Sequence, residues 1–599
     1  MLGRSILSSR FRLQLLAGAL SGLAGGLLFA WAMQEQGMTV AVAGLLGLPS
    51  TGFGLAVHLA LACLFGAGFA AVFGFRPESY APTLAFGLLY GLLWWIVGPL
   101  TLKPILDGGS PSWSLTIAVA AFPSFVGHLL YGGVTALGLY ALMTALARTL
   151  PERADTPSPA RPRAHIVILG GGFGGLACAQ RLEELALRAM DLDVTLVSQS
   201  NYLLFTPMLA EVASSGLEAQ HISAPIRVAC RRTRFLRGDV EAVDTAARVV
   251  SVRTAAGGPP ERLPYDHLVL AVGSVPNFHG LPGLAEHSCT LKTLQDAADL
   301  RNHVIAALER ADVETDPEER RRRLTFVVAG AGFAGTELVA ELLDLARDVA
   351  RYYPNVGRMD RRFILVHSGD RILPEMSPEL AAYALGKLEG RGIEVLLGRR
   401  VSGATAEAVH LNDGSEIPTR TLVWTAGNQP NPVVGTLPCA RNRGGQVVTD
   451  AALRVEGLED VWAVGDCAEI PDILNDGKPC PPTAQHALRQ GKLVAENAAA
   501  ALRRQPAKPF RFRTIGLLVV LGRRTAAAEI RGRRFSGLLA WLMWRSVYLS
   551  KLPGMEKKVR VALDWTLDLF FPRDVVLTSD GPVPTVTEMI GGRSEEEER

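Results

Sequence analysis

The first quarter of the chain is dominated by four long apolar runs. They cover residues 13–33, 54–74, 81–102 and 122–147 and contain no Asp, Glu, Lys or Arg. Each run reaches the roughly 20 residues that a helix needs to cross the hydrocarbon core of a bilayer. We therefore expect residues 1–150 to form an all-α, four-helix transmembrane domain. A cleaved signal peptide is the alternative for the first run alone, but three further runs favour a membrane domain.

Positive charge flanks these runs on one side. Arginines precede the first run and follow the second and the fourth: Arg4, Arg10, Arg12, Arg76, Arg148, Arg153, Arg161 and Arg163. Cytoplasmic loops concentrate Lys and Arg, so both ends of the domain should be cytoplasmic. The sequence predicts a multi-pass protein of the inner (cytoplasmic) membrane, with the rest of the chain on the cytoplasmic side.

The membrane region also looks duplicated. Residues 22–28 resemble residues 87–93, and His58 and His128 are each followed ten residues later by a glycine. This similarity predicts two helical hairpins in a parallel repeat. Histidines inside a membrane could ligate haem, bind a ligand or transfer protons. The alternative is that both are neutral and hydrogen-bonded between helices.

Beyond a proline-rich linker at residues 151–163, two short apolar runs are each followed by a glycine-rich turn and a helical pattern. The turns are residues 170–175 (Gly-Gly-Gly-Phe-Gly-Gly) and 330–335 (Gly-Ala-Gly-Phe-Ala-Gly). Such glycines allow a tight turn and a close approach to a pyrophosphate, which the helix N-terminus stabilises. One such turn is weak evidence, because ordinary glycine-rich turns share the spacing. Two of them predict two dinucleotides, a nicotinamide and a flavin, in a hydride relay.

Composition narrows the function further. The chain has 599 residues, a formal net charge of +3 and 48% hydrophobic residues, with a mean hydropathy of +0.21. The small net charge gives no reason to expect nucleic acid as a partner. The seven cysteines form no C-x-x-C pair, and their spacing predicts neither a metal site nor structural disulfides.

Three further segments, at residues 268–273, 421–427 and 461–466, read as strands that end in glycine. With them, the sequence resembles the type II NADH:quinone dehydrogenases, the single-chain, non-pumping respiratory flavoenzymes, over residues 163–578. The most specific matching segments are residues 201–209, 330–337, 425–431, 465–468 and 481–487.

The resemblance implies an α/β fold with two Rossmann-like dinucleotide-binding domains. The expected divisions are an FAD domain at 164–321 and 433–510, an NAD(P)H domain at 322–432, a C-terminal membrane-associated quinone-site region at 511–580 and a tail at 581–599. It also implies FAD as cofactor, NADH or possibly NADPH as substrate, and a membrane quinone as acceptor. Hydride would pass from NADH to FAD and two electrons then to the quinone, without proton pumping.

The resemblance also assigns site residues. For FAD they are Gly170, Gly172, Gly175, Ser198, Asp466 and Ala484; for the nicotinamide nucleotide they are Gly330, Gly332, Gly335, His367 and Gly427. Glu337 and Gln485 are the expected catalytic residues. Glu337 would orient the nicotinamide or deliver protons, although a negative charge near a helix N-terminus is the alternative explanation. The Gln485 amide would donate to a quinone carbonyl.

This sequence departs from the family pattern at three positions. Ser198 replaces the acidic residue that binds the ribose of FAD, but its hydroxyl can still form that hydrogen bond. His367 stands at the equivalent position of the second fold, where the missing carboxylate, with Arg371 nearby, could admit NADPH. Arg489 replaces the last glutamine of the family pattern A-Q-x-A-x-Q, so the type of quinone stays open.

Residues 531–573 mix aromatic, leucine and basic side chains without a span long enough to cross a bilayer. Such amphipathic segments lie in the membrane interface, where the family places its quinone site. A homodimer interface is a compatible use of the same segment.

Two other functions compete with this one. A sulfide:quinone reductase would need a redox pair among Cys178, Cys289 and Cys467, and none is recognisable. A membrane redox sensor would use the four-helix domain to bind a ligand.

Overall fold

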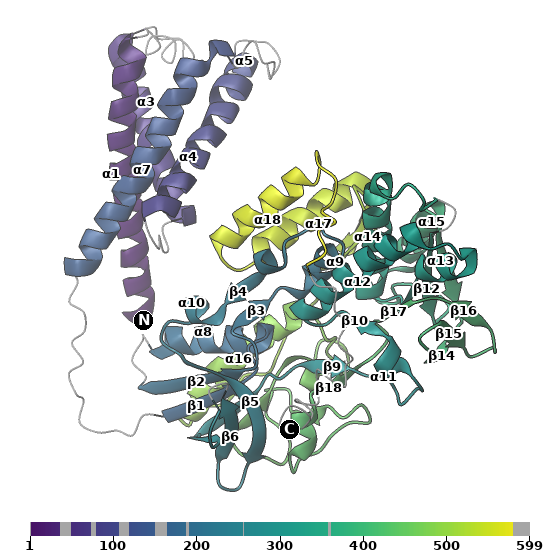
Figure 1. The fold of residues 1–599 in the computed structure, drawn as a ribbon. Helices are drawn as coiled ribbons and strands as arrows, with labels where there is room; N and C mark the ends of the chain where they lie inside the picture. Colours follow the sequence, from purple (N-terminus) through teal and green to yellow (C-terminus); the bar gives the residue numbers. More distant parts are fainter. Residues whose placement is uncertain are drawn as a thin grey trace. The chain divides into compact units, whose positions relative to one another are not determined.

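The computed structural model describes residues 2–35, 50–73, 80–106, 119–149, 164–186, 191–254, 257–357 and 361–578. The chain divides into two compact units, residues 1–161 and 162–599 (Figure 1). The expected linker at 151–163 and the tail at 581–599 lie outside the described residues. Each unit is considered separately.

The first unit is helical. Four of its described segments are long and apolar enough to cross a membrane: Arg12–Trp31, Thr51–Ala71, Thr83–Leu106 and Phe122–Leu146. They belong to helices α1 (Leu2–Glu35), α3 (Thr51–Phe73), α4 (Tyr80–Val97) with its continuation α5 (Lys103–Leu106), and α7 (Phe122–Thr149). A π-helical turn at Gly98–Leu102 joins α4 to α5. The four apolar runs are therefore confirmed as helices.

Small residues let the helices of each hairpin touch through their backbones. A Cβ added at Gly22 of α1 would lie 2.3 Å from the carbonyl oxygen of Ala62 on α3. A Cβ added at Gly87 of α4 would likewise lie 2.3 Å from the carbonyl oxygen of Gly132 on α7. Apolar helices associate by close packing at such positions. The two hairpins therefore use the same kind of contact.

The second unit begins with a seven-stranded sheet in the order β20-β8-β1-β2-β5-β6-β7. Its first five strands are parallel. The strands are β1 (Ala164–Leu169), β2 (Leu192–Ser198), β5 (Arg234–Asp244), β6 (Val249–Thr254), β7 (Glu261–Pro264), β8 (His267–Leu270) and β20 (Val461–Ala463). Helix α8 (Phe173–Ala186) follows β1 and packs closely on α16 (Ala484–Ala501). A Cβ at Gly491 would lie 2.0 Å from the carbonyl oxygen of Gly174, so no larger side chain fits between these helices.

A second parallel sheet has the order β10-β17-β11-β12-β13. Its strands are β10 (Cys289–Thr290), β11 (Thr325–Ala329), β12 (Arg362–His367), β13 (Ile393–Leu397) and β17 (Thr421–Trp424), and helix α14 (Phe333–Val349) follows β11. Two short strands, β9 (Ser274–Pro276) and β18 (Asn428–Pro430), pair where the chain leaves the first sheet and returns.

Two elements that precede residue 322 contact the second sheet and its core. Strand β10 pairs with β17, and helix α12 (Leu294–Val313) packs into the same core as β11 and α14. Both elements therefore belong to the second domain. A two-residue strand is too short to show an alternating or apolar pattern, so β10 and its pairing with β17 cannot be predicted from the sequence.

The C-terminal region begins as a sheet before it becomes helical. Strands β24 (Gly516–Val520), β25 (Ala526–Ile530) and β26 (Arg533–Ser536) form an antiparallel meander, followed by helices α17 (Gly537–Lys551) and α18 (Met555–Leu567). In Figure 1 the two helices, in yellow-green, lie beside α9 (Leu209–Ala213) and α14. Trp541, Trp544 and Trp565 share one core with α14.

Candidate active site

The first glycine turn has the three features that a dinucleotide fold needs. Gly170 has φ +107°, a backbone conformation that favours glycine. A Cβ at Gly175 would lie 1.9 Å from the carbonyl oxygen of Gly170, so α8 can pack on β1 only with glycine there. A Cβ at Gly172 would meet nothing within 4 Å. Among the described residues nothing fills the space at Gly172, which fits a position that a pyrophosphate approaches.

The second turn repeats this geometry. Gly330 also has φ +107°, a Cβ at Gly335 would lie 1.9 Å from the carbonyl oxygen of Gly330, and a Cβ at Gly332 would meet nothing within 4 Å. The Thr425 hydroxyl, which the sequence reasoning did not single out, donates to the carbonyl oxygens of Ala329 (2.8 Å) and Gly330 (3.1 Å). Both turns therefore fit a dinucleotide.

The two strand ends opposite these turns differ. Ser198 ends β2, close to the first turn: a Cβ added at Gly171 would lie 2.8 Å from Ser198 Oγ. His367 ends β12, and its Nδ1 accepts a hydrogen bond from the backbone N–H of Ala331 at 3.3 Å. Burial lowers the pKa of His367, against the opposing effect of Glu375 and Asp370. A neutral imidazole that accepts at Nδ1 carries its proton on Nε2.

Asp466 belongs to a small polar network that the sequence did not reveal. The Ser274 hydroxyl donates to Asp466 Oδ2 at 2.8 Å, and Lys292 Nζ donates to Ser274 Oγ at 2.9 Å. Lys292 Nζ also lies 3.8 Å from Asp466 Oδ2 and 3.4 Å from Asn428 Oδ1. Burial lowers the pKa of Lys292. Lys292 stands just after the two-residue strand β10, so only the folded chain shows that it meets Asp466.

Ala484 opens helix α16, and the loop before Asp466 is tied to that helix. The backbone N–H of Gly465 donates to Gln490 Oε1 at 3.0 Å. Gln490 is therefore a buried structural partner beside the departure at Arg489. Gly427 lies at the crossing between the domains with φ +121°, where a Cβ would lie 2.6 Å from His279 Nε2.

Glu337 lies two residues after the second glycine turn and is only 8% exposed. Its Oε1 accepts from the backbone N–H of Val520 on β24 (3.0 Å) and from Trp544 Nε1 on α17 (3.2 Å). Burial raises the pKa of Glu337 to about 8, and the carboxylates of Glu211 and Glu341 add to this effect. Glu337 is therefore protonated at neutral pH, unlike a charge that merely stabilises a helix N-terminus.

The Gln485 side chain forms hydrogen bonds at the end of strand β24 opposite to the one that Glu337 contacts. Its Nε2 donates to the carbonyl oxygen of Gly516, and its Oε1 accepts from the backbone N–H of Ile515, each at 3.3 Å. Glu337 instead contacts Val520, at the far end of the strand. A five-residue strand spans roughly 13 Å between its end residues. The structure therefore joins the two candidate catalytic residues through β24 and not by direct contact.

A row of aromatic rings connects the first glycine turn with the C-terminal helices. The ring centroids of Phe173 and Phe205 are 5.9 Å apart, those of Phe205 and Tyr548 6.0 Å, and those of Tyr548 and Trp544 4.6 Å. Phe173 starts α8, and Trp544 donates to Glu337. The row thus runs from the first nucleotide turn to the carboxyl group beside the second.

Comparison with known proteins identifies the family. Residues 164–491 match the pyridine nucleotide-disulphide oxidoreductase family, and residues 515–574 match the NDH2 C-terminal domain. A type II NADH:quinone oxidoreductase (Ndh) of Mycobacterium tuberculosis is 31% identical over 444 residues, which cover 72% of this chain and 92% of the relative. The chain belongs to the type II NADH:quinone oxidoreductases.

Other members of the family agree over a similar length. The probable NADH dehydrogenase of Dictyostelium discoideum is 31% identical over 417 residues, covering 68% of this chain and 90% of the relative. The structure of NDH2 from Plasmodium falciparum has a TM-score of 0.64 at 19% identity and covers 69% of this chain and 100% of that chain. This likeness shows a shared fold. The expected α/β fold and family are confirmed.

The cysteines lack the features of a redox pair. Burial raises the pKa of Cys289 to about 12 and that of Cys467 to about 11, and it also raises the pKa of Cys178. A thiol is reactive as the thiolate, which these sites disfavour. Among the described residues, no group of three or more His, Cys, Asp or Glu side chains is placed to hold a metal ion.

The two histidines of the helical unit have backbone partners. His58 Nε2 lies 3.0 Å from the carbonyl oxygen of Gly26 on the neighbouring helix α1, and His128 Nδ1 lies 2.7 Å from that of Ser124. Both rings also pack against Phe29, with centroid distances of 5.3 and 4.9 Å. These contacts favour the hydrogen-bonded interpretation over a haem-ligating one.

Proposed function

We propose that this type II NADH:quinone oxidoreductase binds FAD at the first glycine turn and a nicotinamide nucleotide at the second, and reduces a membrane quinone. The observation that carries the proposal is the open space at Gly172 and Gly332, which no part of the protein fills. When bound, FAD would supply the two-electron chemistry between NADH and quinone. The protein supplies binding, orientation and proton control.

The residues have separate tasks in this reaction. Gly170, Gly172 and Gly175 would hold the FAD pyrophosphate at the N-terminus of α8, and Ser198 would bind the adenosine ribose. Asp466, positioned by Ser274 and Lys292, and the backbone at Ala484 would hold the rest of the cofactor. Glu337, which holds a proton at neutral pH, would give it up as the quinone is reduced. Gln485 Nε2 donates to Gly516, and its second N–H would donate to a quinone carbonyl.

The second nucleotide site supports NADH and also leaves room for NADPH. The strand-end carboxylate that would repel a 2′-phosphate is absent, because His367 stands in its place. We propose that Gly330, Gly332, Gly335 and Gly427 line this site and that His367 contacts the adenosine ribose. An anionic phosphate would meet a neutral imidazole at the strand end, with the carboxylates of Asp370 and Glu375 nearby.

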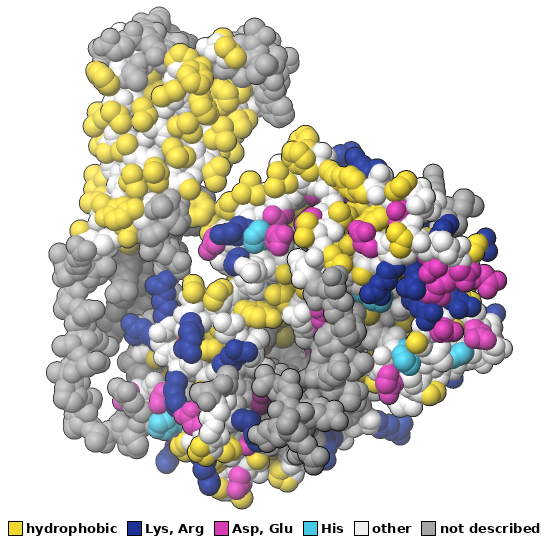
Figure 2. All heavy atoms as spheres, in the orientation of Figure 1, with side chains coloured by type: hydrophobic (Ala, Val, Ile, Leu, Met, Phe, Trp, Pro, Cys, Tyr) yellow, Lys and Arg dark blue, Asp and Glu magenta, His cyan; other side chains and the backbone are white. Residues whose placement is uncertain are grey.

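Apolar side chains are exposed on the C-terminal helices and after them. Leu538, Leu539, Leu542, Leu563, Leu567, Phe570 and Phe571 are each at least 45% exposed, and yellow side chains also cover much of the helical unit (Figure 2). We propose that these seven residues, the apolar C-terminal face, lie in the membrane interface. The four helices would cross the inner membrane, with the flavin-binding unit on the cytoplasmic side. A homodimer could use part of the same face.

Anaerobic stopped-flow absorption tests the main proposal. NADH or NADPH is mixed with the FAD-loaded protein to measure flavin reduction, and a quinone is then added to measure reoxidation. We expect bleaching by NADH and recovery with a lipid quinone. Failure of both nucleotides to bleach the flavin would remove the donor assignment. Sulfide-dependent bleaching that a single Cys→Ser change abolishes would instead favour the sulfide:quinone reductase.

Removing residues 1–161 tests the role of the helical unit. If that unit is only an anchor, the remaining chain keeps NADH:quinone reductase activity and still sediments with lipid vesicles through the apolar C-terminal face. Loss of quinone reduction with intact flavin reduction would make the helices part of the quinone route. A ligand that binds only the full chain and alters flavin reduction would favour a sensor. Light scattering in detergent measures whether the chain is a dimer.

A further inference from the structure

Six acidic side chains line one seam between helix α14 and the C-terminal region. Four of them lie on one face of α14, three or four residues apart: Glu337, Glu341, Asp344 and Asp348. Glu211 on α9 and Asp568 after α18 complete the seam. So much negative charge in a largely buried seam requires compensation, because an isolated buried carboxylate is unstable.

Arginines compensate four of the six. Glu341 pairs with Arg573 at 2.7 Å, Asp348 and Asp568 pair with Arg523 at 2.9 and 3.1 Å, and Asp344 pairs with Arg391. Arg573 is itself buried and also donates to the carbonyl oxygen of Ser214 at 3.2 Å. Each of these four acids therefore has a positively charged partner.

Glu211 and Glu337 have a different environment. Both are 8% exposed, and neither forms an ion pair in the part of the chain that the structure describes. Trp565 Nε1 donates to both carboxyl oxygens of Glu211 at 3.2 Å, just as Trp544 Nε1 donates to Glu337. The two indole rings lie against each other with centroids 6.0 Å apart. The indole donors by themselves favour the charged carboxylates, but a neutral indole does not cancel a charge, so burial without a cationic partner outweighs them.

Other charged groups face the two carboxyls from every neighbouring element. Glu211 meets Glu341 of α14, Arg545 of α17 and Arg573 of the C-terminal segment. Glu337 meets Glu211 and Glu341, and its charge also acts on Tyr548 of α17. Burial raises the pKa of each carboxyl to about 8, with repulsion from Glu341 adding to the shift in both.

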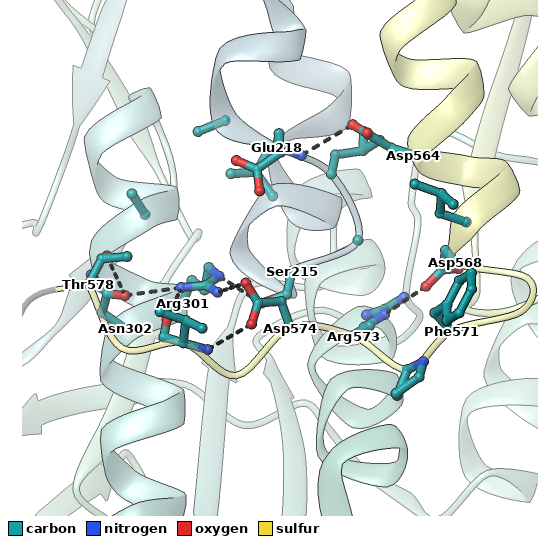
Figure 3. Close-up of a pocket in the computed structure, with 18 residues that line it drawn as sticks. Ser215, Glu218, Arg301, Asn302, Asp564, Asp568, Phe571, Arg573, Asp574 and Thr578 are labelled. Atoms are coloured by element: carbon teal, nitrogen blue, oxygen red, sulfur yellow. Dashed lines mark hydrogen bonds and ion pairs between the residues drawn. The ribbon is translucent and has the colours of Figure 1, made fainter.

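A cavity of about 370 Å³ lies next to this seam (Figure 3). Val212 and Gly216, on either side of the turn that follows Glu211, line it, and so do Arg573 and Asp568. The backbone N–H of Gly216 donates to the carbonyl oxygen of Glu211 at 2.7 Å. The cavity therefore reaches the seam at Asp568 and Arg573, and Val212, the residue after Glu211, also lines it.

We propose that Glu211 and Glu337 form a two-carboxyl proton store that supplies quinol formation and is refilled from this cavity. The inference rests on the proposed function. Reduction of a quinone by NADH consumes one proton from solvent: NADH + H⁺ + quinone gives NAD⁺ + quinol. The O–H bond of Glu337 breaks as an O–H bond forms on the quinone oxygen. Glu211 then returns a proton to Glu337 and is itself reprotonated by cavity water.

The test compares Glu211→Gln with Glu218→Gln in the full-length, FAD-loaded protein. Glu218 lines the same cavity but is exposed, so its replacement is a matched control. Infrared difference spectra measure the C=O band of protonated buried carboxyls as the pH rises through about 8. We expect two deprotonating carboxyls in the wild type and in Glu218→Gln, but one in Glu211→Gln. The remaining one should titrate at lower pH, because the like-charged neighbour is gone.

Stopped flow supplies the second readout. In Glu211→Gln we expect quinone-driven flavin reoxidation at about pH 9 to slow about tenfold, with reduction by NADH unchanged. An unchanged carboxyl band, or a reoxidation profile like that of the wild type, overturns the proposal. If Glu211→Gln does not fold, Trp565→Phe removes the indole donor and should raise the pH at which Glu211 titrates; no change in the band would also overturn it. A flavin that NADH cannot reduce contradicts the proposed function instead, while the infrared count stands by itself.

Discussion

The two glycine turns have nearly the same backbone and quite different surroundings. Gly170 and Gly330 share φ +107°. A Cβ added at Gly175 or at Gly335 would lie equally close to the carbonyl oxygen of the first glycine of its turn. Opposite the first turn stands Ser198, and opposite the second stands His367. Two residues after each turn, Ala177 follows the first turn and Glu337 follows the second. Both turns therefore fit a dinucleotide, and we expect the flanking side chains to determine which one each would bind.

The largest effect should come from the glycine that faces open space. In Gly172→Ala the new methyl group has no protein neighbour within 4 Å, so the melting temperature of the apoprotein should hardly change while FAD binding is lost. In Gly332→Ala, FAD should stay bound while kcat/KM for NADH falls about 100-fold, or about 2.7 kcal/mol. Visible absorption and stopped-flow reduction measure both. Loss of FAD from Gly332→Ala would show that the turns are not separate sites.

Gly175→Ala and Gly335→Ala are the matched controls. Their added Cβ would lie 1.9 Å from a carbonyl oxygen, so both should destabilise the fold, by about 1 to 3 kcal/mol of overpacking. Thermal unfolding of the FAD-loaded protein measures the loss. Equal stability of all four variants would contradict the packing role of the third glycine.

The next effect concerns Glu337, which stands after the second turn where Ala177 stands after the first. Because the pKa of Glu337 is raised to about 8, the donor form is present below that pH and is lost as the pH rises through it. Wild-type flavin reoxidation by quinone should therefore decline above about pH 8. Glu337→Gln should slow reoxidation about 100-fold and remove this decline, with flavin reduction by NADH preserved. The reverse change, Ala177→Glu, should lower the melting temperature, because Ala177 is only 2% exposed.

A smaller effect is expected at the end of β12. In His367→Glu a carboxylate would face the nucleotide ribose and repel a 2′-phosphate, so the NADPH:NADH ratio of kcat/KM should fall about tenfold. The pKa of His367 is lowered, so its contact with the N–H of Ala331 is kept above about pH 6.5 and weakens as the pH falls. Steady-state kinetics with both nucleotides checks the ratio. An unchanged ratio would mean that nucleotide choice lies elsewhere.

The smallest effect is expected at the end of β2. Ser198→Ala removes one neutral hydroxyl from the FAD ribose, which is worth about 0.5 to 1.5 kcal/mol. The Kd for FAD should rise about threefold to tenfold, as measured by reconstitution of the apoprotein. Ser198→Asp should instead tighten binding. A larger loss in Ser198→Ala than in Gly172→Ala would reverse the proposed order of importance.

The elements that the sequence revealed are those with a strong local pattern. The run before the first turn is strand β1, the four apolar runs are helices, and the glycines stand where strand meets helix. The sheet β24–β26 was not predicted: strands β24 and β25 precede the aromatic and basic segment 531–573 on which the expectation for this region rested. Strand β10, which joins the second sheet, was not predicted because it is only two residues long.

The sequence by itself determined the two nucleotide turns, the family and the apolar helices, because each depends on residues that are neighbours along the chain. Only the tertiary structure decided the states of Glu337, Lys292 and Glu211. Their partners, Val520, Asp466 and Trp565, lie more than 170 residues away along the chain. Burial by those distant segments shifts the pKa values of the three groups. A carboxyl group has its ordinary pKa in an unfolded chain, and the packed C-terminal region gives this pair its protons at neutral pH.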